Sequence, residues 1–380
     1  MTAPDRPLRV LWLIKGLGPG GAERLLVSQA GATDHDAFTI TAAHLVPWKD
    51  HLVGELREQG VDVVCLDGER ELDPRWAWRL RALVRERRID VVHVHSPYVA
   101  AVARLSLRTL PSGTRPAVVA TEHNRWPRHA AATRLANRLT IRLDDADLAV
   151  SADVRDTMGP HVRDRVEVLV HGVDLAAVRA AASERDAVRA ELGIGPDEVV
   201  VGTVANYRAE KGYDVLLDAA AKAIQRDPHL RVVAVGQGPL EDEMRDRHRE
   251  LGLGDRVLLT GYRDDAVRVM AGFDLFTLAS RHEGLPVSLM DALVLGLPVV
   301  ATRVGGIPEA VDDGVEGVLV PPDDPDAMAD AYVALAADPD RRRTLAAAAG
   351  ARGPEFDIAV ATRRIEAIYR ELAARGSNRS

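Results

Sequence analysis

The chain has 380 residues, of which 47% are hydrophobic and 28% charged, and its net charge is −8. This composition is typical of a folded protein with room for two domains, and the negative balance argues against a protein that mainly coats nucleic acid. The single cysteine, Cys65, excludes an intrachain disulfide and a cysteine-based zinc site. We therefore expect a cytoplasmic protein, since the N-terminus lacks the pattern of a secretory signal and no apolar run reaches transmembrane length.

The first half of the chain alternates short β-branched runs with amphipathic stretches. The predicted strands are 8–14, 38–45, 61–66, 89–95, 117–121, 146–151 and 165–170. This alternation predicts a parallel sheet covered by helices. It stops between about 172 and 198, where we expect a connection that contains one helix.

The alternation then restarts and runs almost to the end of the chain. The predicted strands are 198–205, 230–236, 255–261, 274–280, 297–302 and 316–321. Apolar residues at helical spacing predict a final helix after them. We therefore predict two α/β domains, 1–175 and 195–354, and a C-terminal segment, 355–380, that packs on one of them. Ligands of such sheets bind beyond the carboxyl ends of the strands, so a cleft between the domains is the expected site.

The loop after the first predicted strand is rich in glycine. In "KGLGPGGAERLL", Gly16, Gly18 and Gly21 fit the G-x-G-x-x-G spacing of dinucleotide sites. The carboxylate that should end the second strand is missing, which disfavours an NAD or FAD site. The loop instead favours close approach of the backbone to an anionic ligand at a helix N-terminus, and a tight turn without a ligand remains an alternative.

Histidines follow two other predicted strands. His93 and His95 in "VVHVHSP" share one face of a strand, and His123 in "VVATEHNRW" stands directly after another. The pair lacks a third metal ligand, so histidines hydrogen-bonded along a cleft are favoured over a metal site. His123 suits a hydrogen bond to a sugar hydroxyl or a proton carrier, and a purely structural role stays open.

The first strand of the second domain leads into "VANYRAEKGYDVLLDAA". Arg208, Lys211 and the turn residue Gly212 stand at a helix entry, an arrangement that suits a diphosphate. Lysine is rare in this chain, which has only four among its 49 basic residues. A solvated, charged turn is the alternative.

The stretch "SRHEGLPVSLMDALVLGLPVVAT" (280–302) places two carboxylates around a helix start. Pro286 fits the first turn of the helix, and Gly296 fits its end. Glu283 stands ahead of the free N–H groups, and Asp291 lies roughly 8 Å further along the axis, at about 1.5 Å per residue. One elongated ligand fits this spacing, with a hydroxyl-bearing group at Glu283, phosphates at the helix N-terminus and a ribose at Asp291. That ligand is a nucleotide sugar.

Together these motifs, with "VGQGPLEDEM", "GYRDDAVRVMAGFDLFTLAS" and "GLPVVATRVGGIPEAVDDGVEGVLVPPDD", resemble the retaining glycosyltransferases of family 4. The match covers nearly the whole chain and is densest over 200–322. The resemblance implies the GT-B fold, with two Rossmann-like doubly wound domains facing across a cleft. The first domain would hold the acceptor and the second the donor, and the C-terminal helix would cross back to the first.

The resemblance also implies roles for individual residues. Glu283 would contact the donor sugar, Asp291 the ribose and Lys211 the diphosphate, while His123 would face the transferred sugar. Further donor contacts are expected from residues of both domains: Gly20 and Gly21 near the phosphates, Tyr262 and Arg263 near the base, and Asn206, Gly284, Leu285, Pro286 and Val287 around the site.

Two positions depart from the family pattern. Asp291 stands where a glutamate is usual, so its ribose contact is expected to be longer or bridged by water. Ala205-Asn206 replaces the usual Gly-Arg pair, which removes the phosphate-binding arginine. We expect Arg208, two residues later, to take its place.

The implied reaction moves a sugar from a nucleotide-diphosphate donor to a hydroxyl acceptor with retention of configuration, without metal or cofactor. The departing diphosphate would help to deprotonate the acceptor, while Lys211, Arg208 and the helix N-terminus stabilise its charge. A sugar-nucleotide epimerase of the same fold and a non-catalytic nucleotide-sugar-binding protein are the alternatives. The nucleotide, the sugar and the acceptor (glycan, lipid-linked or small molecule) stay open.

Two basic segments in the first domain contain tryptophan. Residues 75–88 hold six arginines with Trp76 and Trp78, and residues 125–142 hold five arginines with Trp126. Arginine mixed with tryptophan favours peripheral contact with an anionic membrane, here the inner face. A solvated helix surface in an arginine-rich chain is the alternative.

Overall fold

The computed structural model describes residues 6–68 and 75–377, and the chain divides into two units. Unit 1 comprises residues 1–172 and 358–380, and unit 2 comprises residues 173–357. Residues 1–5 and 69–74 of the predicted first domain, and 378–380 of its final segment, lie outside the described residues.

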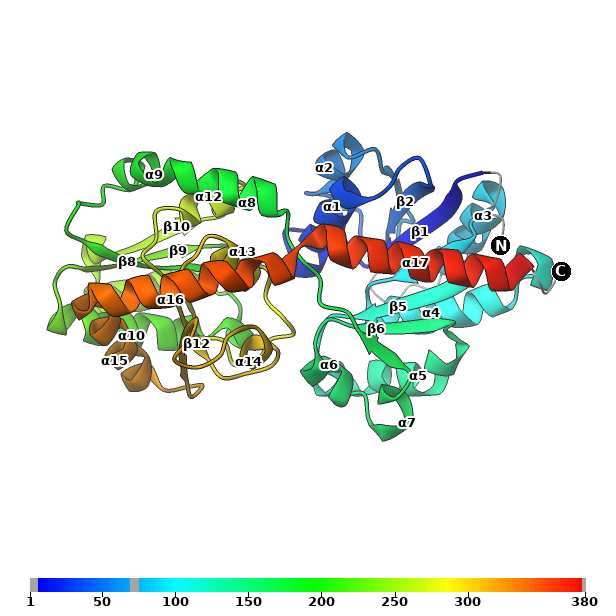
Figure 1. Cartoon of the computed structure of the whole chain (residues 1–380). Helices are drawn as coiled ribbons and strands as arrows, with labels where there is room; N and C mark the ends of the chain where they lie inside the picture. The colour runs from blue at the N-terminus through cyan, green and yellow to red at the C-terminus, as the bar shows by residue number, and fades with distance from the viewer. Residues whose placement is uncertain (1–5, 69–74, 378–380) are drawn as a thin grey trace. The chain divides into compact units, whose positions relative to one another are not determined.

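Unit 1 is built on a seven-stranded parallel sheet in the order β3-β2-β1-β4-β5-β6-β7 (Figure 1). Its strands are β1 Leu8–Ile14, β2 Phe38–His44, β3 Asp62–Cys65, β4 Val91–Val94, β5 Ala117–Glu122, β6 Ala146–Ala149 and β7 Val166–Val168. Its helices are α1 Gly21–Ala32, α2 Val53–Glu58, α3 Trp76–Arg87, α4 Pro97–Arg108, α5 Ala131–Thr140, α6 Ala152–Asp156, α7 Pro160–Arg163 and α17 Ile358–Ser377.

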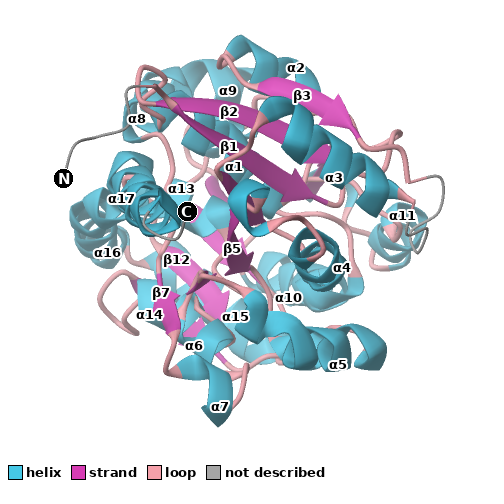
Figure 2. Ribbon diagram, turned by 90° about the vertical axis from the view of Figure 1, so that its right-hand side faces the viewer, coloured by secondary structure: helices cyan, strands magenta, loops and turns pink. Residues whose placement is uncertain are grey.

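Alternating residues of the strands in unit 1 face two separate apolar layers. Val10 and Trp12 of β1 pack with α1 and with α17, whereas Leu11 and Leu13 pack with α3 and α4. This alternation follows from the two-residue period of a strand, and helices on both faces are what a parallel sheet requires. Figure 2 shows helices around the central strands of this sheet. The C-terminal helix thus completes the core of the first unit.

Unit 2 repeats the same plan with a six-stranded parallel sheet in the order β10-β9-β8-β11-β12-β13. Its strands are β8 Val199–Val204, β9 Leu230–Val235, β10 Val257–Gly261, β11 Leu275–Leu278, β12 Val299–Thr302 and β13 Gly317–Val320. Its helices are α8 Leu175–Ala181, α9 Arg185–Glu191, α10 Tyr213–Arg226, α11 Glu241–Glu250, α12 Ala266–Met270, α13 Val287–Val294, α14 Ile307–Ala310, α15 Pro325–Ala337 and α16 Pro339–Arg352.

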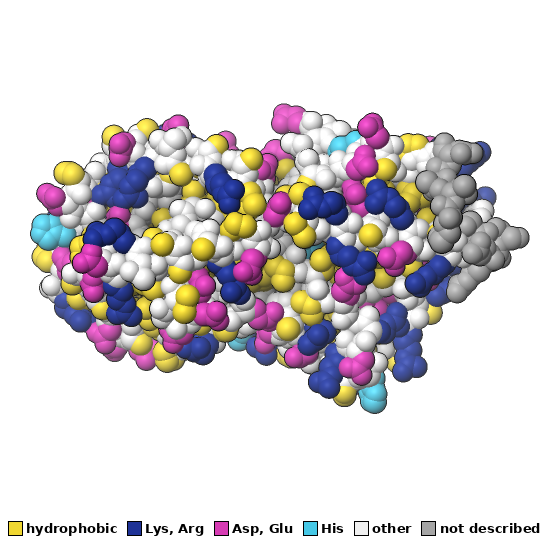
Figure 3. Space-filling model, in the orientation of Figure 1, with side chains coloured by type: hydrophobic (Ala, Val, Ile, Leu, Met, Phe, Trp, Pro, Cys, Tyr) yellow, Lys and Arg dark blue, Asp and Glu magenta, His cyan; other side chains and the backbone are white. Residues whose placement is uncertain are grey.

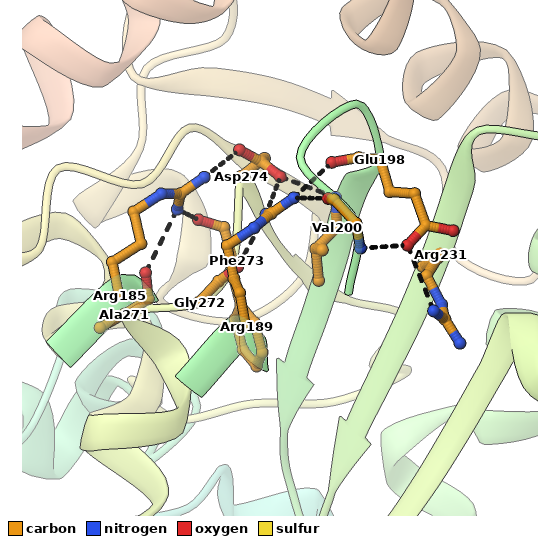
Figure 4. Close-up of polar contacts among 10 residues, drawn as sticks. Arg185, Arg189, Glu198, Val200, Arg231, Ala271, Gly272, Phe273 and Asp274 are labelled. Carbon is orange, nitrogen blue, oxygen red and sulfur yellow. Dashed lines mark hydrogen bonds and ion pairs between the residues drawn. The ribbon is translucent and has the colours of Figure 1, made fainter. Parts of the chain in front are cut away.

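The connection between the two sheets differs from the prediction, because it holds two helices, α8 and α9, joined by a short 3₁₀ turn. Two arginines of α9 tie it to the strands of unit 2 (Figure 4). Arg185 donates to the Phe273 carbonyl (2.6 Å) and pairs with Asp274 (2.6 Å). The buried Arg189 also reaches Asp274 (3.0 Å), whose carboxylate accepts the backbone N–H of Val200 at the start of β8. These bonds satisfy backbone carbonyls and dock α9 on the strands of the unit.

Every predicted strand is present, within a few residues of its predicted ends. Both sheets also reverse their strand order once, between β1 and β4 in unit 1 and between β8 and β11 in unit 2. In doubly wound sheets, ligands bind beyond the carboxyl ends of the strands at this reversal. We therefore expect the candidate site residues in the loops that follow these four strands.

Candidate functional site

The reversal point of unit 2 brings together Lys211, in the loop after β8, and Glu283, in the loop after β11. Lys211 Nζ lies 2.7 and 2.8 Å from the two carboxylate oxygens of Glu283. Ser280 Oγ donates to Glu283 Oε1 at 2.6 Å. Glu283 is buried and Lys211 is partly buried, so each depends on the other for charge compensation. The two residues predicted to hold one ligand thus lie side by side.

Glycine at position 212 makes this approach possible. Gly212 has a left-handed backbone (φ 62°), and a Cβ added to it would lie 2.1 Å from the carbonyl oxygen of Ala279. No residue with a side chain fits that contact without moving the backbone. Gly212 is also the N-cap of α10, so the turn, the helix start and the end of β11 are held in one position.

Arg281 adds a second link between the same two loops. Its guanidinium donates to both carboxylate oxygens of Asp214 (2.9 and 2.7 Å) and to the Ala209 carbonyl (3.0 Å). Its backbone N–H donates to the Glu210 carbonyl at 2.8 Å. Arg281 and Ser280 were not among the predicted site residues, although both lie within the quoted motif. The contacts of Arg281 with the loop that holds Lys211 depend on strand order, which the motif does not reveal.

The N-terminus of α13 lies immediately beyond Glu283. Pro286 was predicted in the first turn of this helix and is instead its N-cap, directly before the first turn. Gly296 follows the helix with a left-handed backbone, as predicted. Gly305 packs so closely on this loop that an added Cβ would lie 2.1 Å from the Glu283 carbonyl oxygen. Gly284, Leu285 and Pro286 are buried, whereas Val287 is partly exposed.

Asp291 lies within α13, in its second turn, and is buried. Its predicted ribose contact stays a prediction. The same holds for Asn206, which follows β8 in a partly buried loop where its carbonyl accepts the Arg208 N–H at 2.8 Å.

Arg208 and Arg263 differ in how far their charges are already used. Arg208 is exposed, and among the described residues nothing is hydrogen-bonded or ion-paired to its guanidinium. Arg263 pairs with Asp265 (2.6 Å) and Glu191 (2.8 Å), and these carboxylates raise the pKa of its guanidinium further. Tyr262 beside it is exposed. Arg208 is therefore more available than Arg263 for contact with an anion. The exposed ring of Tyr262 is available for contact with a nucleotide base.

The glycine-rich loop of unit 1 connects β1 to α1. Gly20 is the N-cap of the helix and Gly21 its first residue. A Cβ on Gly20 would collide with the Glu23 carboxylate, 2.2 Å away. β2 ends at His44, without the carboxylate that a dinucleotide site requires. The donor-phosphate role predicted for Gly20 and Gly21 stays a prediction.

Unit 1 gathers four histidines beyond the carboxyl edge of its sheet. The ring centroids of His93 and His95 are 4.1 Å apart, those of His95 and His123 are 5.6 Å apart, and those of His123 and His171 are 5.6 Å apart. Burial lowers the pKa of His93, His95 and His123 well below the usual range, and that of His171 to about 4. The cluster is therefore neutral at pH 7. His171, which follows β7, was not predicted.

The two basic segments expose different apolar residues from those expected. Trp76 and Trp126 are buried in the two apolar cores that hold α3 and α6, so the prediction that they contribute to a surface was wrong. Trp126 also donates from its ring nitrogen to Glu122 at 3.0 Å. Trp78, 71% exposed, does lie on the surface, with Arg81 over its ring.

Helix α5 provides the apolar surface of the second segment. Leu135 and Leu139 are 59% and 74% exposed. Arg138 and Arg142 flank them and line a cavity of about 250 Å³ together with His161 of α7. Within residues 6–68 and 75–377, neither arginine has an ion-pair partner. Figure 3 shows basic side chains over this part of unit 1.

None of the described helices is long and apolar enough to cross a bilayer. No three histidine, cysteine or acidic side chains within the described residues are arranged to hold a metal ion.

Comparison with known proteins identifies the family. A model described as Glycosyltransferase Family 4 matches residues 19–177, and one described as Glycosyl transferases group 1 matches residues 198–338. The chain belongs to the family 4 glycosyltransferases. The two matched ranges fall on the two α/β units, so the family pattern covers both sheets of this chain.

Individual relatives of this family 4 chain differ in how much of their length it matches. It is 36% identical over 250 residues to the D-inositol 3-phosphate glycosyltransferase of Saccharomonospora viridis, covering 63% of this chain and 56% of that protein. It is 24% identical over 338 residues to an Escherichia coli UDP-Gal:alpha-D-GlcNAc-diphosphoundecaprenol alpha-1,3-galactosyltransferase, covering 84% and 85%. The chain spans about half the length of the inositol-phosphate enzyme.

Solved structures identify the fold. Anabaena HepE, determined in complex with UDP and glucose, superposes with a TM-score of 0.82 at 22% identity, covering 95% of this chain and 99% of that one. The structure thus has the GT-B fold, with two Rossmann-like units, as the motifs predicted.

Proposed function

We propose that this chain transfers a sugar from a nucleotide-diphosphate sugar to a hydroxyl acceptor. The observation that carries the proposal is the Lys211–Glu283 pair at the strand-order reversal of unit 2, directly before the N-terminus of α13. A nucleotide sugar carries both an anion for Lys211 and hydroxyls for Glu283. Such a ligand can replace the contact between the two side chains with one contact for each.

The comparisons support this choice of ligand. HepE was solved with UDP and with UDP-glucose, and the Escherichia coli relative is named as a UDP-galactose enzyme. We propose a nucleoside diphosphate at Lys211 and Arg208, the ribose at Asp291 and the transferred sugar at Glu283 and His123. The remaining donor contacts are those assigned above to Gly20, Gly21, Asn206, Tyr262, Arg263 and residues 284–287.

The stereochemistry and the lack of a cofactor are part of the same proposal. We propose that the anomeric configuration is retained and that Lys211, Arg208 and the α13 N-terminus supply the positive charge for the leaving group without a metal ion. An assay in EDTA should match one without it, and NMR of the product should show an α-anomer from an α-linked donor. Loss of transfer in EDTA that Mg²⁺ restores would refute metal independence.

The donor site is tested by thermal shift with UDP, GDP, ADP and dTDP and their common sugar conjugates. A ligand that binds the native state raises its apparent stability by mass action. One nucleotide series should raise the melting temperature of the wild type but not of Lys211→Ala. Lys222→Ala is the matched control, because Lys222 lies on α10 and pairs on the surface with Asp326 (2.5 Å). If no nucleotide shifts a folded wild-type sample, or if both variants lose the shift, the proposal fails.

We propose in addition that unit 1 contacts an anionic membrane through segment 125–142, with segment 75–88 adding charge. Leu135 and Leu139 would enter the interface between flanking arginines, and phosphate headgroups would approach Arg138, Arg142 and His161. The cytoplasmic face of the membrane remains the predicted location.

Vesicle flotation tests the membrane contact. The wild type should float with phosphatidylglycerol vesicles at low salt, and this should weaken for Leu135→Ser/Leu139→Ser. Val315→Ser removes an exposed apolar residue from unit 2 and should change nothing. A wild type that stays in the soluble fraction would refute the membrane contact without affecting the transferase proposal.

A further inference from the structure

The histidine cluster of unit 1 rests on a hydrogen-bonded chain that begins at Trp12. Trp12 Nε1 lies 3.2 Å from the hydroxyl of Tyr369, which lies 2.6 Å from His93 Nδ1. An indole N–H can only donate, so the Tyr369 oxygen accepts it, and the same hydroxyl shares a second hydrogen bond with His93 Nδ1. His93 Nε2 shares a hydrogen bond with Thr121 Oγ1 at 2.7 Å. Both nitrogens of His93 are thus occupied.

The ring of His95 contacts the ring of His93 on one side and that of His123 on the other. Its Nδ1 lies 3.3 Å from His123 Nε2. Its other nitrogen, Nε2, is buried and has no partner within the described residues. A neutral imidazole has one N–H, so in this hydrogen bond either His95 donates to His123 or His123 donates to His95.

The burial of His95 Nε2 favours one of these arrangements. If His123 donated, the proton of His95 would have to lie on Nε2, as a buried N–H without an acceptor. Orphaned buried N–H groups are rarer in proteins than under-satisfied buried acceptors, and each one forfeits a hydrogen bond that it would make in water. The proton of His95 therefore belongs on Nδ1, where it has an acceptor.

We propose that His95 is a positioning residue that donates Nδ1–H to His123 Nε2 and thereby holds His123 in the tautomer protonated on Nδ1. Among the described residues, nothing is hydrogen-bonded to Nδ1 of His123. His123 then offers an N–H to a ligand oxygen and has no free lone pair for accepting a proton. The assignment of this donor to the sugar site rests on the proposed function; the tautomer itself does not.

The surroundings of His123 keep it in the neutral form that this tautomer requires. His171 lies on its other side, and both of its ring nitrogens are buried without a partner in the part of the chain that the structure describes. A charged His123 would face only neutral rings there. Sequence reasoning had left open whether His123 is a hydrogen-bond donor or a proton carrier, and this arrangement favours the donor.

The tautomer is measured directly by long-range ¹H–¹⁵N correlation on the full chain labelled with ¹⁵N-histidine. The signals of His123 are assigned by their loss in His123→Gln. At pH 7.5, its Nδ1 should have the shift of a protonated nitrogen and its Nε2 that of an unprotonated one. The reverse pattern, or averaging between the two, would overturn the proposal whether or not sugar transfer is detected.

A pair of variants tests whether His95 sets that tautomer. His95→Phe keeps a ring but removes the donor, whereas His95→Asn keeps an N–H donor near the position of Nδ1. In His95→Phe, the proton of His123 should move at least partly to Nε2, and in His95→Asn it should stay. His44→Phe, which removes another buried imidazole of the same unit, should leave His123 unchanged. An unchanged His123 in His95→Phe would overturn the positioning role.

Kinetics separate positioning from packing. His95→Phe should lower kcat by about 10- to 100-fold with little change in the KM of the donor, the range found for residues that orient a metal-binding histidine through its second nitrogen. His95→Asn should recover most of that loss. Equal losses in both variants would mean that the ring matters only for packing. If the wild type transfers no sugar, the proposed function fails, and the tautomer is still decided by NMR.

Discussion

The two strand-order reversals of this family 4 chain occupy equivalent places in two similar sheets but differ in charge. In unit 2 the loops after β8 and β11 hold a cation and an anion in direct contact, Lys211 and Glu283. In unit 1 the edge beyond β4 and β5 holds neutral imidazoles, because burial lowers their pKa values. Sheet topology selects the place, and the residues at the strand ends select its chemistry.

This difference separates what each unit can do for a ligand. An ion pair can be exchanged for stronger contacts with a charged ligand, so unit 2 suits the phosphates and hydroxyls of the donor. Neutral rings offer directed hydrogen bonds without a net charge, so unit 1 suits an uncharged part of a substrate. Substitutions in the ion pair of unit 2 should therefore alter contacts with charged groups of a ligand. Substitutions in the histidine cluster of unit 1 should alter hydrogen bonding and the pH dependence of stability.

The largest effect is expected from Glu283→Gln, which removes the negative charge of the pair with almost no change in shape. Sugar transfer should fall by about 10²- to 10³-fold, the cost of losing one preorganised electrostatic contact. UDP should bind at least as well as to the wild type, because Lys211 no longer has a competing partner. Initial rates and isothermal titration measure the two quantities.

Glu250→Gln serves as the control for this charge change, since Glu250 is an exposed partner of Arg247 on α11. It should leave transfer within about twofold, as expected for a surface ion pair. If Glu283→Gln retained transfer at a similar level, the carboxylate would have no role in the reaction. A wild type that binds a nucleotide sugar but never turns it over would instead favour the binding-protein alternative, and turnover without an acceptor would favour the epimerase.

A smaller effect is expected from alanine at Gly212, compared with alanine at Gly193. Both glycines have left-handed backbones (φ 62° and 65°), but a Cβ meets the Ala279 carbonyl at 2.1 Å only at position 212. Gly193→Ala should cost about 1 kcal/mol for backbone strain alone. Gly212→Ala should cost about 3 kcal/mol, since β11 must also move. Hydrogen exchange of β11 and α10 amides measures both, and equal costs would contradict the close approach.

The fold was largely predictable from the sequence, because hydrophobic periodicity and β-branched runs marked every strand and the final helix. Lys211 and Glu283 were predicted for one ligand, yet their direct contact was not. It depends on β8 lying beside β11 while β9 and β10 lie on the other side, and periodicity does not determine strand order. Trp76 and Trp126 were misjudged for a related reason, since arginine-rich surroundings say nothing about which face of a helix is buried.

His171 shows the same limit in unit 1. It follows a strand of only three residues, and its contact with His123 arises because β5, β6 and β7 are neighbours in the sheet. Nothing in the sequence around a lone histidine in such a loop indicates that its ring belongs to a cluster with three other imidazoles.

The smallest expected effect is a change of stability with pH. It arises from the neutral histidine cluster of unit 1 and not from the ion pair of unit 2. The pKa of His171 is about 4 in the folded chain and about 6.5 in an unfolded one. Above pH 6.5 the ring is neutral in both states. As the pH falls from 6.5 toward 4, the unfolded state binds a proton that the folded state does not, so stability falls. His171 alone should cost unit 1 about 2 kcal/mol between pH 7.5 and 5.

Tryptophan fluorescence isolates this effect, because all five tryptophans lie in unit 1, at positions 12, 48, 76, 78 and 126. The free energy of unfolding in urea should fall between pH 7.5 and pH 5 for the wild type. For His171→Leu it should fall by about 2 kcal/mol less. His161→Leu, which replaces an exposed histidine, should keep the wild-type fall. The three other buried rings add to the wild-type slope, so His171→Leu should flatten it without removing it. An unchanged slope would mean that His171 is protonated or solvated in the folded protein, and the electrostatic contrast between the two units would then be smaller than the structure indicates.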